Sequence, residues 1–83
     1  MLMRVVAVRD SKTEAFGQPF FCVTKGYAIR SFADEVQRSG SEFGKHPEDF
    51  ALFYLGDFDD SLGTFGCALA PEQISLAMDH VKV

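Results

Sequence analysis

Six consecutive apolar or aromatic residues at positions 50–55 (Phe-Ala-Leu-Phe-Tyr-Leu) constrain the fold more than any other part of this chain. A strand with one face in water alternates apolar and polar side chains, whereas this run is apolar at every position. Both sets of alternating side chains are therefore apolar, and each contains an aromatic ring. We expect a central strand that is buried on both faces and that ends at the turn-rich residues 56–63.

The length and composition predict one domain, residues 1–83. A chain this short buries only about 60 to 65% of the surface that its unfolded form exposes, so its margin of stability is thin. Hydrophobic residues make up 47% of the sequence, and nine residues are Phe. This surplus predicts either a dense core or a core plus an oligomer interface, because aromatic residues are enriched at the centres of such contacts.

Patterns along the chain predict an α+β fold: an antiparallel sheet of about four strands with one main helix on one face, and a short C-terminal helix or tail. The order is two strands, the helix, then two strands paired as a hairpin. The segment 12–17 is expected to be a helical turn or a loop. The strands are predicted at residues 3–9, 18–23, 50–55 and 64–69.

The main helix is predicted to begin after Thr24, a good N-cap residue, and to end at Gly40. Its apolar positions follow the spacing i, i+3, i+4, i+7. A second, short helix is expected from Pro71, although the apolar residues there also alternate as in a strand. The apolar positions of the main helix are Ile29, Phe32, Ala33 and Val36.

The two cysteines, Cys22 and Cys67, lie in apolar strand-like sequence, and we expect both thiols to pack as small hydrophobic side chains. They form no CxxC pair, and the N-terminus lacks the charged start of a signal peptide. No apolar run approaches the roughly 18 residues needed to cross a membrane. We expect a protein of the reducing cytoplasm with no membrane contact.

Candidate clusters for chemistry are few. His46, Glu48 and Asp49 combine a histidine with two carboxylates, but other metal ligands at a recognisable spacing are missing, and a structural turn explains them better. The acidic residues 57–60 lack the spacing and the closing Glu of an EF-hand. We therefore predict no catalytic residue, no metal and no cofactor, and a protein that is not an enzyme.

Charge is distributed unevenly along the chain. The net charge is −4, yet residues 1–45 carry a balance of +2 and residues 46–83 a balance of −6. Because separated charges are screened at physiological salt, a local basic face can bind an anion despite the acidic total. Basic side chains near aromatic ones are the combination that holds single-stranded nucleic acid. The candidate phosphate contacts are Arg4, Arg9, Lys12, Lys25, Arg30, Arg38 and Lys45, and the best stacking candidate is Tyr27.

Several phrases of the sequence resemble the small non-structural protein of gokushoviruses, which are microvirus phages with single-stranded circular DNA. The similarity runs through residues 4–60 and weakly through the tail. The most specific part joins Lys-His-Pro-Glu-Asp at 45–49 to Leu-Phe-Tyr-Leu-Gly-Asp-Phe-Asp at 52–59; the other phrases are Asp-Ser-Lys at 10–12, Gln-Pro-Phe-Phe at 18–21 and Ala-Ile-Arg-Ser-Phe at 28–32. This resemblance implies a DNA-binding protein that acts in the switch from duplex replication to single-strand synthesis and packaging.

These observations predict a non-enzymatic phage accessory protein of the host cell cytoplasm that binds single-stranded DNA during replication or packaging of the viral genome. A homodimer or larger homo-oligomer would combine weak basic faces. The alternative is a protein-interaction module that modulates the replication initiator or a host replication protein without touching DNA. A third hypothesis is a small metal-dependent enzyme that uses His46 and Glu48.

Overall fold

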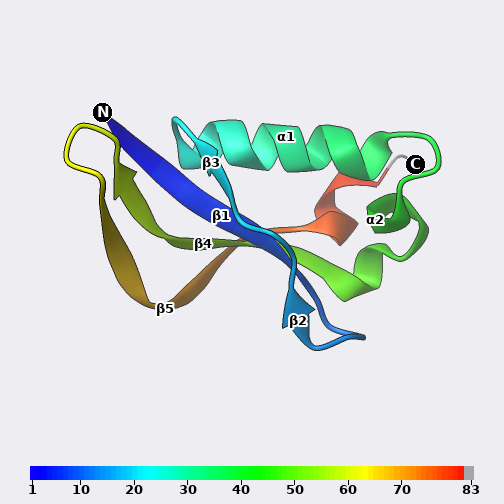
Figure 1. Ribbon diagram of the computed structural model, residues 1–83. Helices are drawn as coiled ribbons and strands as arrows, with labels where there is room; N and C mark the ends of the chain where they lie inside the picture. The colour runs from blue at the N-terminus through cyan, green and yellow to red at the C-terminus, as the bar shows by residue number, and fades with distance from the viewer. Residues whose placement is uncertain (82–83) are drawn as a thin grey trace.

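The computed structural model of the chain, which describes residues 1–81, has an antiparallel sheet with one long helix across one of its faces (Figure 1). β1 and β4 pair in the middle of the sheet, and β5 pairs with the other side of β4. β2 and β3 lie one after the other along the opposite edge of β1. The predicted α+β class is confirmed. The strands are β1 (Leu2–Asp10), β2 (Ala15–Phe16), β3 (Phe20–Cys22), β4 (Phe50–Asp59) and β5 (Thr64–Leu76).

The long helix, α1 (Lys25–Gln37), begins where the sequence predicts. The Thr24 hydroxyl oxygen accepts a hydrogen bond from the backbone N–H of Tyr27 at 3.0 Å, which satisfies one of the free donors of the first turn. The helix ends three residues earlier than predicted, because the residue after Gln37 is already extended. Gly40, with φ of +83°, lies instead in the connection that follows the helix.

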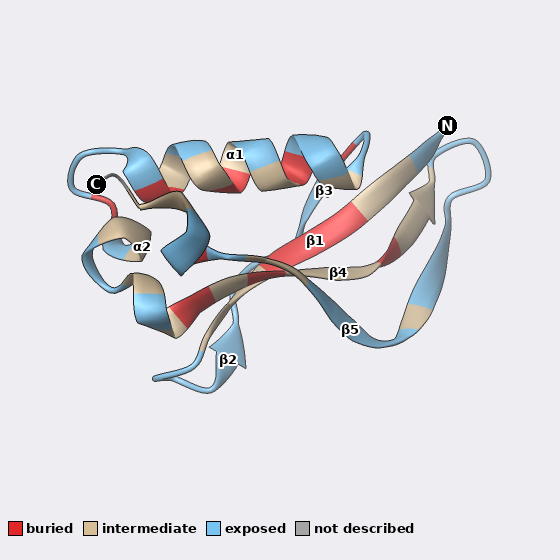
Figure 2. Cartoon of the chain, turned by 180° about the vertical axis from the view of Figure 1, so that it is seen from behind, coloured by how far each residue is buried: buried red, intermediate tan, exposed pale blue. Residues whose placement is uncertain are grey.

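Buried residues lie on α1 and on the central strands (red in Figure 2), and most of them form one cluster between the helix and the sheet. Val6 and Leu52, from the two central strands, have no contact with solvent. Cys22 is buried in this cluster as predicted, whereas Cys67 is exposed, because β5 is an edge strand. The helix contributes Ala28, Phe32 and Val36, and the remaining members are Phe50 and Ala77.

The prediction that residues 50–55 are buried on both faces is wrong. Phe50 and Leu52 point toward α1 and are buried, whereas Ala51 and Phe53 on the other face are only half-buried. Among residues 1–81 a second layer covers one face only, because the chain forms one long helix and has no element left to cover the other face. The apolar residues of this strand therefore lie in two different environments, the core under α1 and the uncovered face of the sheet.

The segment 12–17, expected to be a helical turn or a loop, contains the short strand β2. Phe16 pairs with Arg9 and Ala15 pairs with Asp10, so this segment is the return of a hairpin that starts at the end of β1. The strand predicted at residues 18–23 is shorter than expected and begins after Pro19, which cannot donate a hydrogen bond to the sheet.

β4 and β5 extend well beyond their predicted limits. β4 does not end at residue 55 but continues through a bulge at Gly56 to Asp59. The helix expected from Pro71 is also wrong, because residues 72, 73, 75 and 76 pair with β4 and extend the edge strand. Proline is tolerated at the edge of a sheet, where its missing N–H costs least. Pairing across the hairpin thus outweighs local helix-starting chemistry.

Three short helical turns connect these elements: α2 (Glu42–Lys45), η1 (Pro47–Asp49) and η2 (Ala77–His80). η1 is the structural turn that the sequence predicts for residues 46–49. Ser41 caps α2 by accepting a hydrogen bond from the backbone N–H of Phe43 at 3.2 Å. η2 follows β5 directly, and residues 82–83 of the expected tail lie outside the described part of the chain.

Candidate nucleic-acid interface

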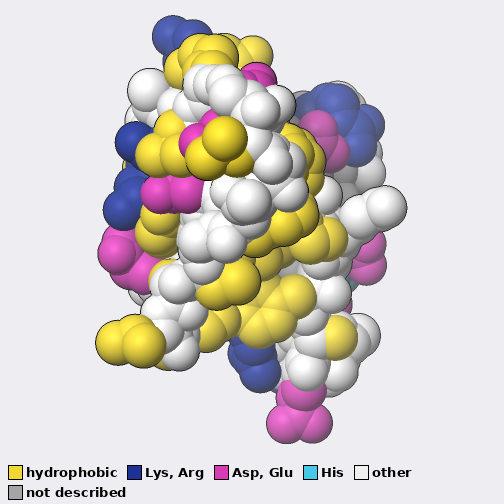
Figure 3. Space-filling view, turned by 60° about the vertical axis from the view of Figure 1, so that its left-hand side comes forward, with side chains coloured by type: hydrophobic (Ala, Val, Ile, Leu, Met, Phe, Trp, Pro, Cys, Tyr) yellow, Lys and Arg dark blue, Asp and Glu magenta, His cyan; other side chains and the backbone are white. Residues whose placement is uncertain are grey.

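The face of the sheet that points away from α1 has no covering layer among residues 1–81; we call it the open face. Val5, Ala7 and Arg9 of β1 belong to it, because the intervening Val6 and Val8 pack into the core. Apolar side chains reach the surface in several patches, with charged groups mainly around their margins (Figure 3). The aromatic side chains that pair across strands on the open face are Phe16, Phe21, Phe53, Phe58 and Phe65.

At the β2 end of the open face, two rings lie beside a cation. The ring centroids of Phe16 and Phe53 are 5.3 Å apart in an edge-to-face arrangement, and the Phe16 side chain is 41% exposed. The guanidinium carbon of Arg9 lies 6.0 Å from the centroid of the Phe16 ring. A partly exposed ring next to a cation can stack on a nucleobase while the cation contacts phosphate.

Arg9 and Lys12 supply the positive charge at this end. Lys12 lies in the turn between β1 and β2, where its backbone N–H donates a hydrogen bond to Asp10. Its side chain is exposed. Neither Arg9 nor Lys12 forms an ion pair with any residue in the described range 1–81. Both cations are therefore free to contact a ligand.

A hollow of about 170 Å³ adjoins Arg9 and Phe53 on the open face. Gln73 and Leu76 of β5 also line it, as do Glu48 and Asp49. Carboxylates repel phosphate but accept hydrogen bonds from the amino groups of bases. The hollow therefore suits a base better than a phosphate group.

At the other end of the open face, three rings from β3, β4 and β5 pack on one another. Phe21 and Phe58 stack with centroids 5.4 Å apart, and Phe58 and Phe65 are tilted at 4.8 Å. Phe65 remains 62% exposed despite these contacts. At the β2 end Arg9 stacks on an aromatic ring, but none of the predicted phosphate-binding cations stacks on this three-ring cluster.

The predicted stacking residue Tyr27 lies elsewhere, on the solvent side of the first turn of α1. Its ring is 52% exposed, and the guanidinium carbon of Arg30 lies 5.3 Å from the ring centroid. Because α1 covers the other face of the sheet, this pair is separated from Arg9 and Phe16 by the thickness of the domain (Figure 1). The structure thus brings Tyr27 and Arg30 together as a second, smaller cation and aromatic group.

Arg4 and Lys25 meet in a network of charges on the helix side of the sheet. Arg4 pairs with Asp57 at 3.1 Å, and Lys25 pairs with Glu72 at 3.3 Å. The Lys25 ammonium also lies 4.1 Å from the centre of the Tyr54 ring. These internal partners compete with phosphate, so the two cations are weaker candidates than the sequence predicts.

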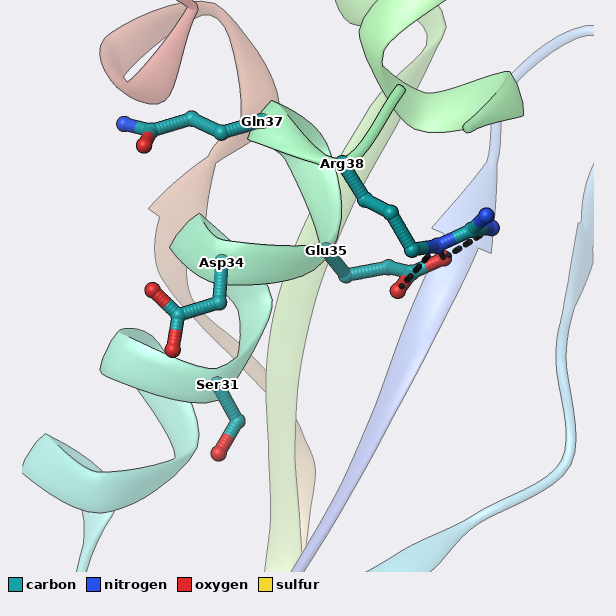
Figure 4. A pocket seen from close by; sticks show the side chains of 5 residues that line it. All are labelled: Ser31, Asp34, Glu35, Gln37 and Arg38. Atoms are coloured by element: carbon teal, nitrogen blue, oxygen red, sulfur yellow. Dashed lines mark hydrogen bonds and ion pairs between the residues drawn. The ribbon is translucent and has the colours of Figure 1, made fainter. Parts of the chain in front are cut away.

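Arg38 and Lys45 lie together beside a hollow between the end of α1 and α2. Arg38 folds back on Glu35, with its Nη2 2.8 Å from one carboxylate oxygen (Figure 4). This interaction lowers the pKa of Glu35 and raises the pKa of Arg38. The larger hollow in Figure 4, about 530 Å³, is an open part of the polar helix surface between Ser31 and Arg38. Lys45, unlike Arg38, has no ion-pair partner among residues 1–81.

The acidic bend at residues 57–60 is tied to the fold. Asp57 accepts hydrogen bonds from Arg4 and from the Tyr54 hydroxyl, and the latter bond raises the pKa of Tyr54. Asp59 accepts backbone hydrogen bonds within the hairpin turn, and Asp60 pairs with the terminal amino group. Asp59 therefore stabilises the turn of the β4–β5 hairpin, whereas Asp57 and Asp60 tie the hairpin to the N-terminal part of the chain.

His46, Glu48 and Asp49 come close enough to share an ion. One possible ligand atom from each lies within 4.8 Å of the others. His46 and Glu48 are exposed, and all three belong to one short turn. Such a group leaves most of a metal's coordination shell to water, whereas structural zinc sites use four protein ligands.

Sequence reasoning missed one aromatic residue of the open face, Phe53. It lies in the run that was expected to be covered on both sides, so its ring was assigned to the core. The available signal was the number of Phe residues, nine in 83, because a chain this short leaves much of its surface exposed.

The fold and the open face define a small two-layer α+β protein with aromatic surface and few free cations. Residues 3–80 match the family model described as Phage ORF5 protein, and the chain belongs to this family. It is therefore a phage protein. No match was found among curated proteins or among solved structures. In residues 1–81 no helix is long and apolar enough to cross a membrane.

Proposed function

We propose that this phage protein is an accessory factor, not an enzyme, that binds single-stranded DNA at the β2 end of its open face. Phe16 and Phe53 stack on bases, and Arg9 and Lys12 contact the flanking phosphates. One observation carries the proposal: the partly exposed Phe16 ring is next to a second ring and next to a cation that has no ion-pair partner in residues 1–81.

An open sheet with aromatic side chains is a physically suitable surface for single strands. Bases in a single strand expose their faces, and each base stacked on an aromatic side chain contributes about 1 to 3 kcal/mol. Sheet-based RNA-binding modules use the same principle. Stacking is tolerant of sequence, so we expect little preference among bases.

The limited number of free cations sets the expected salt dependence. Two phosphate contacts per chain, from Arg9 and Lys12, would give a slope of log K against log salt of about −1.4 on single strands. Seven contacts from all predicted cations would give about −5. A shallow slope is consistent with the net charge of −4 and with three of the seven cations being paired internally.

Fluorescence anisotropy with a labelled oligothymidine at about 20 mM salt tests the proposal. We expect Phe16→Ala to weaken binding about tenfold, which corresponds to the loss of one stacked base. Arg9→Ala should weaken binding and make the salt slope shallower by about 0.7. Arg38→Ala is the matched control, because Arg38 pairs with Glu35 away from the open face and its loss should change little.

Two results would overturn this assignment. The first is no binding at low salt. The second is binding that survives Phe16→Ala and Arg9→Ala but is lost in Tyr27→Ala, which would place the DNA on α1.

The second candidate function is a protein-interaction module that acts on the replication initiator or on a host replication protein. The exposed apolar surface of the open face favours it, since Phe65 and Leu76 are 62% and 40% exposed. A pull-down from infected cells that recovers such a protein after nuclease treatment would support this function. Both candidates place the protein in the cytoplasm of the host cell.

A further inference from the structure

The outer edge of β5 is a long strand edge without a partner among residues 1–81. β5 is the last strand of the sheet and pairs only with β4 (Figure 1). Its first half, residues 64–70 (Thr-Phe-Gly-Cys-Ala-Leu-Ala), contains no charged residue and no proline. Natural proteins usually protect such an edge with lysine, proline or a covering element, because its free backbone groups can pair with another chain.

The middle of this strand bends away from β4. Cys67 pairs with Gly56 and Glu72 pairs with Tyr54, so residues 68–71 stand opposite Leu55 alone and have no partner in the register. Leu69 lies in this segment and its side chain is completely exposed. Phe65, two residues before Cys67, is 62% exposed. An apolar edge therefore projects from the sheet with its backbone available for pairing.

We infer that β5 pairs with β5 of a second copy of this chain, antiparallel and about a two-fold axis at Cys67. Two-fold symmetry places residue i of one chain opposite residue 134 − i of the other, so each Phe65 faces Leu69 of the partner. Two of the most exposed apolar side chains of the chain would then cover each other.

The absence of charged residues at positions 64–70 favours a second copy of this chain as the partner of β5, and it favours this register. A two-fold strand pair places the same segment of both chains side by side, so a segment that carried net charge would repel its copy. Residues 64–70 are uncharged, and their midpoint is residue 67. In this register the paired segment runs from residue 64 to residue 70 in both chains, so no acid lies opposite another acid.

The opposite edge of the sheet is a poorer choice for pairing. It consists of two short strands, β2 and β3, with Pro19 between them. The proposed dimer is independent of DNA binding, because it uses the β5 edge rather than Phe16 and Arg9. If both hold, the dimer carries two Phe16 sites on one continuous sheet.

Cys67 provides a direct test of the register. Cα atoms of directly opposed residues in antiparallel strands are about 4.5 to 5.5 Å apart, within the range that a disulfide requires. In Cys22→Ala, which leaves Cys67 as the single thiol, diamide should take up the two electrons and two protons of a pair of thiols and link two chains. The reaction is run at a concentration where the measured mass in solution is that of a dimer, twice the 9.2 kDa of one chain. We expect most of the protein to become a covalent dimer under these conditions.

Two variants test the interface without the cross-link, with sedimentation equilibrium as the measurement. Leu69→Glu should raise the dimer dissociation constant at least tenfold, and because Leu69 is fully exposed it should leave the monomer folded by circular dichroism. Cys67→Glu should raise it further by placing two like charges at the axis. Met78→Glu, an equally drastic change at an exposed residue outside β5, is the control and should have no effect.

The inference is overturned if the protein is monomeric at all concentrations. It is also overturned if a dimer persists unchanged in Leu69→Glu, or if Cys67 fails to cross-link within a dimer. Oligothymidine binding by Leu69→Glu distinguishes the two proposals, because it should be retained at the Phe16 site whether or not the dimer forms.

Discussion

Leu52 and Phe53 are neighbours in sequence and both are apolar, yet they have different roles. Leu52 points toward α1 and has no exposed surface, whereas Phe53 points to the open face and contacts Phe16. In a strand this difference follows from alternation alone. Alternation does not show which face of the sheet the helix covers. Whether an apolar residue of this strand is buried can therefore be told only once the position of the helix is known.

Tyr54 gives a prediction for the dependence of stability on pH. Its hydroxyl donates a hydrogen bond to Asp57 at 2.8 Å, and this bond raises the pKa of Tyr54 from 10.0. The folded state therefore retains the proton more strongly than the unfolded state, and this contribution to stability is complete below pH 10 and is lost as pH rises through the raised pKa. In Tyr54→Phe, the fall in the free energy of unfolding between pH 9 and 11 should be shallower.

Urea denaturation at a series of pH values measures this effect. The amino terminus and Cys22 also have raised pKa values, but both are present in the wild type and in Tyr54→Phe, so the difference between the two proteins isolates Tyr54. At neutral pH the variant should lose about 1 kcal/mol from the missing hydrogen bond. Identical pH profiles for the two proteins would show that this hydrogen bond is absent in solution.

At the scale of elements, the β4–β5 hairpin shows long-range pairing prevailing over local signals. Pro71 with two polar residues behind it is typical of a helix start, yet the segment is extended because β4 offers it a partner. The turn signals of residues 56–63 likewise mark two separate features. Gly56 forms a bulge inside β4, and the turn itself lies at residues 60–63.

Gly56→Ala tests the importance of this bulge. Gly56 has φ of +152°, and a Cβ atom there would lie 2.4 Å from the carbonyl oxygen of Gly66. We expect a loss of about 1 to 3 kcal/mol in the free energy of unfolding, from backbone strain and this clash. Gly66→Ala is the matched control, since a Cβ there meets nothing within 4 Å. Urea midpoints that fall equally in the two variants would contradict the bulge geometry.

At the scale of the whole molecule, a one-sided core leaves little reserve of stability. The buried cluster lies between one helix and one face of the sheet, while several aromatic rings on the other face stay partly exposed. These rings contribute less to folding than buried ones, because part of their surface remains in water. The molecule thus keeps aromatic side chains on its surface, where a ligand can contact them.

Phe32→Ala measures how far the fold depends on this core. Phe32 is 3% exposed and contacts the rings of Phe43 and His80. Its truncation should cost about 3 to 5 kcal/mol and lower the melting temperature by about 12 °C or more. Tyr27→Ala, at a half-exposed position of the same helix, should melt close to the wild type. Comparable melting of both variants would mean that α1 does not pack as described.

Features that depend on near neighbours can be predicted from the order of residues alone: the strand at residues 50–55, the start of α1 after Thr24, and the α+β class. Three other features depend on how the elements pack: which face of the sheet is covered, the pairing of residues 72–76 with β4 in place of a helix, and which cations have no ion-pair partner among residues 1–81. Arg4 meets Asp57 and Lys25 meets Glu72 across 53 and 47 residues of chain. No local pattern specifies such partners, because they depend on how strands distant in sequence are placed beside one another.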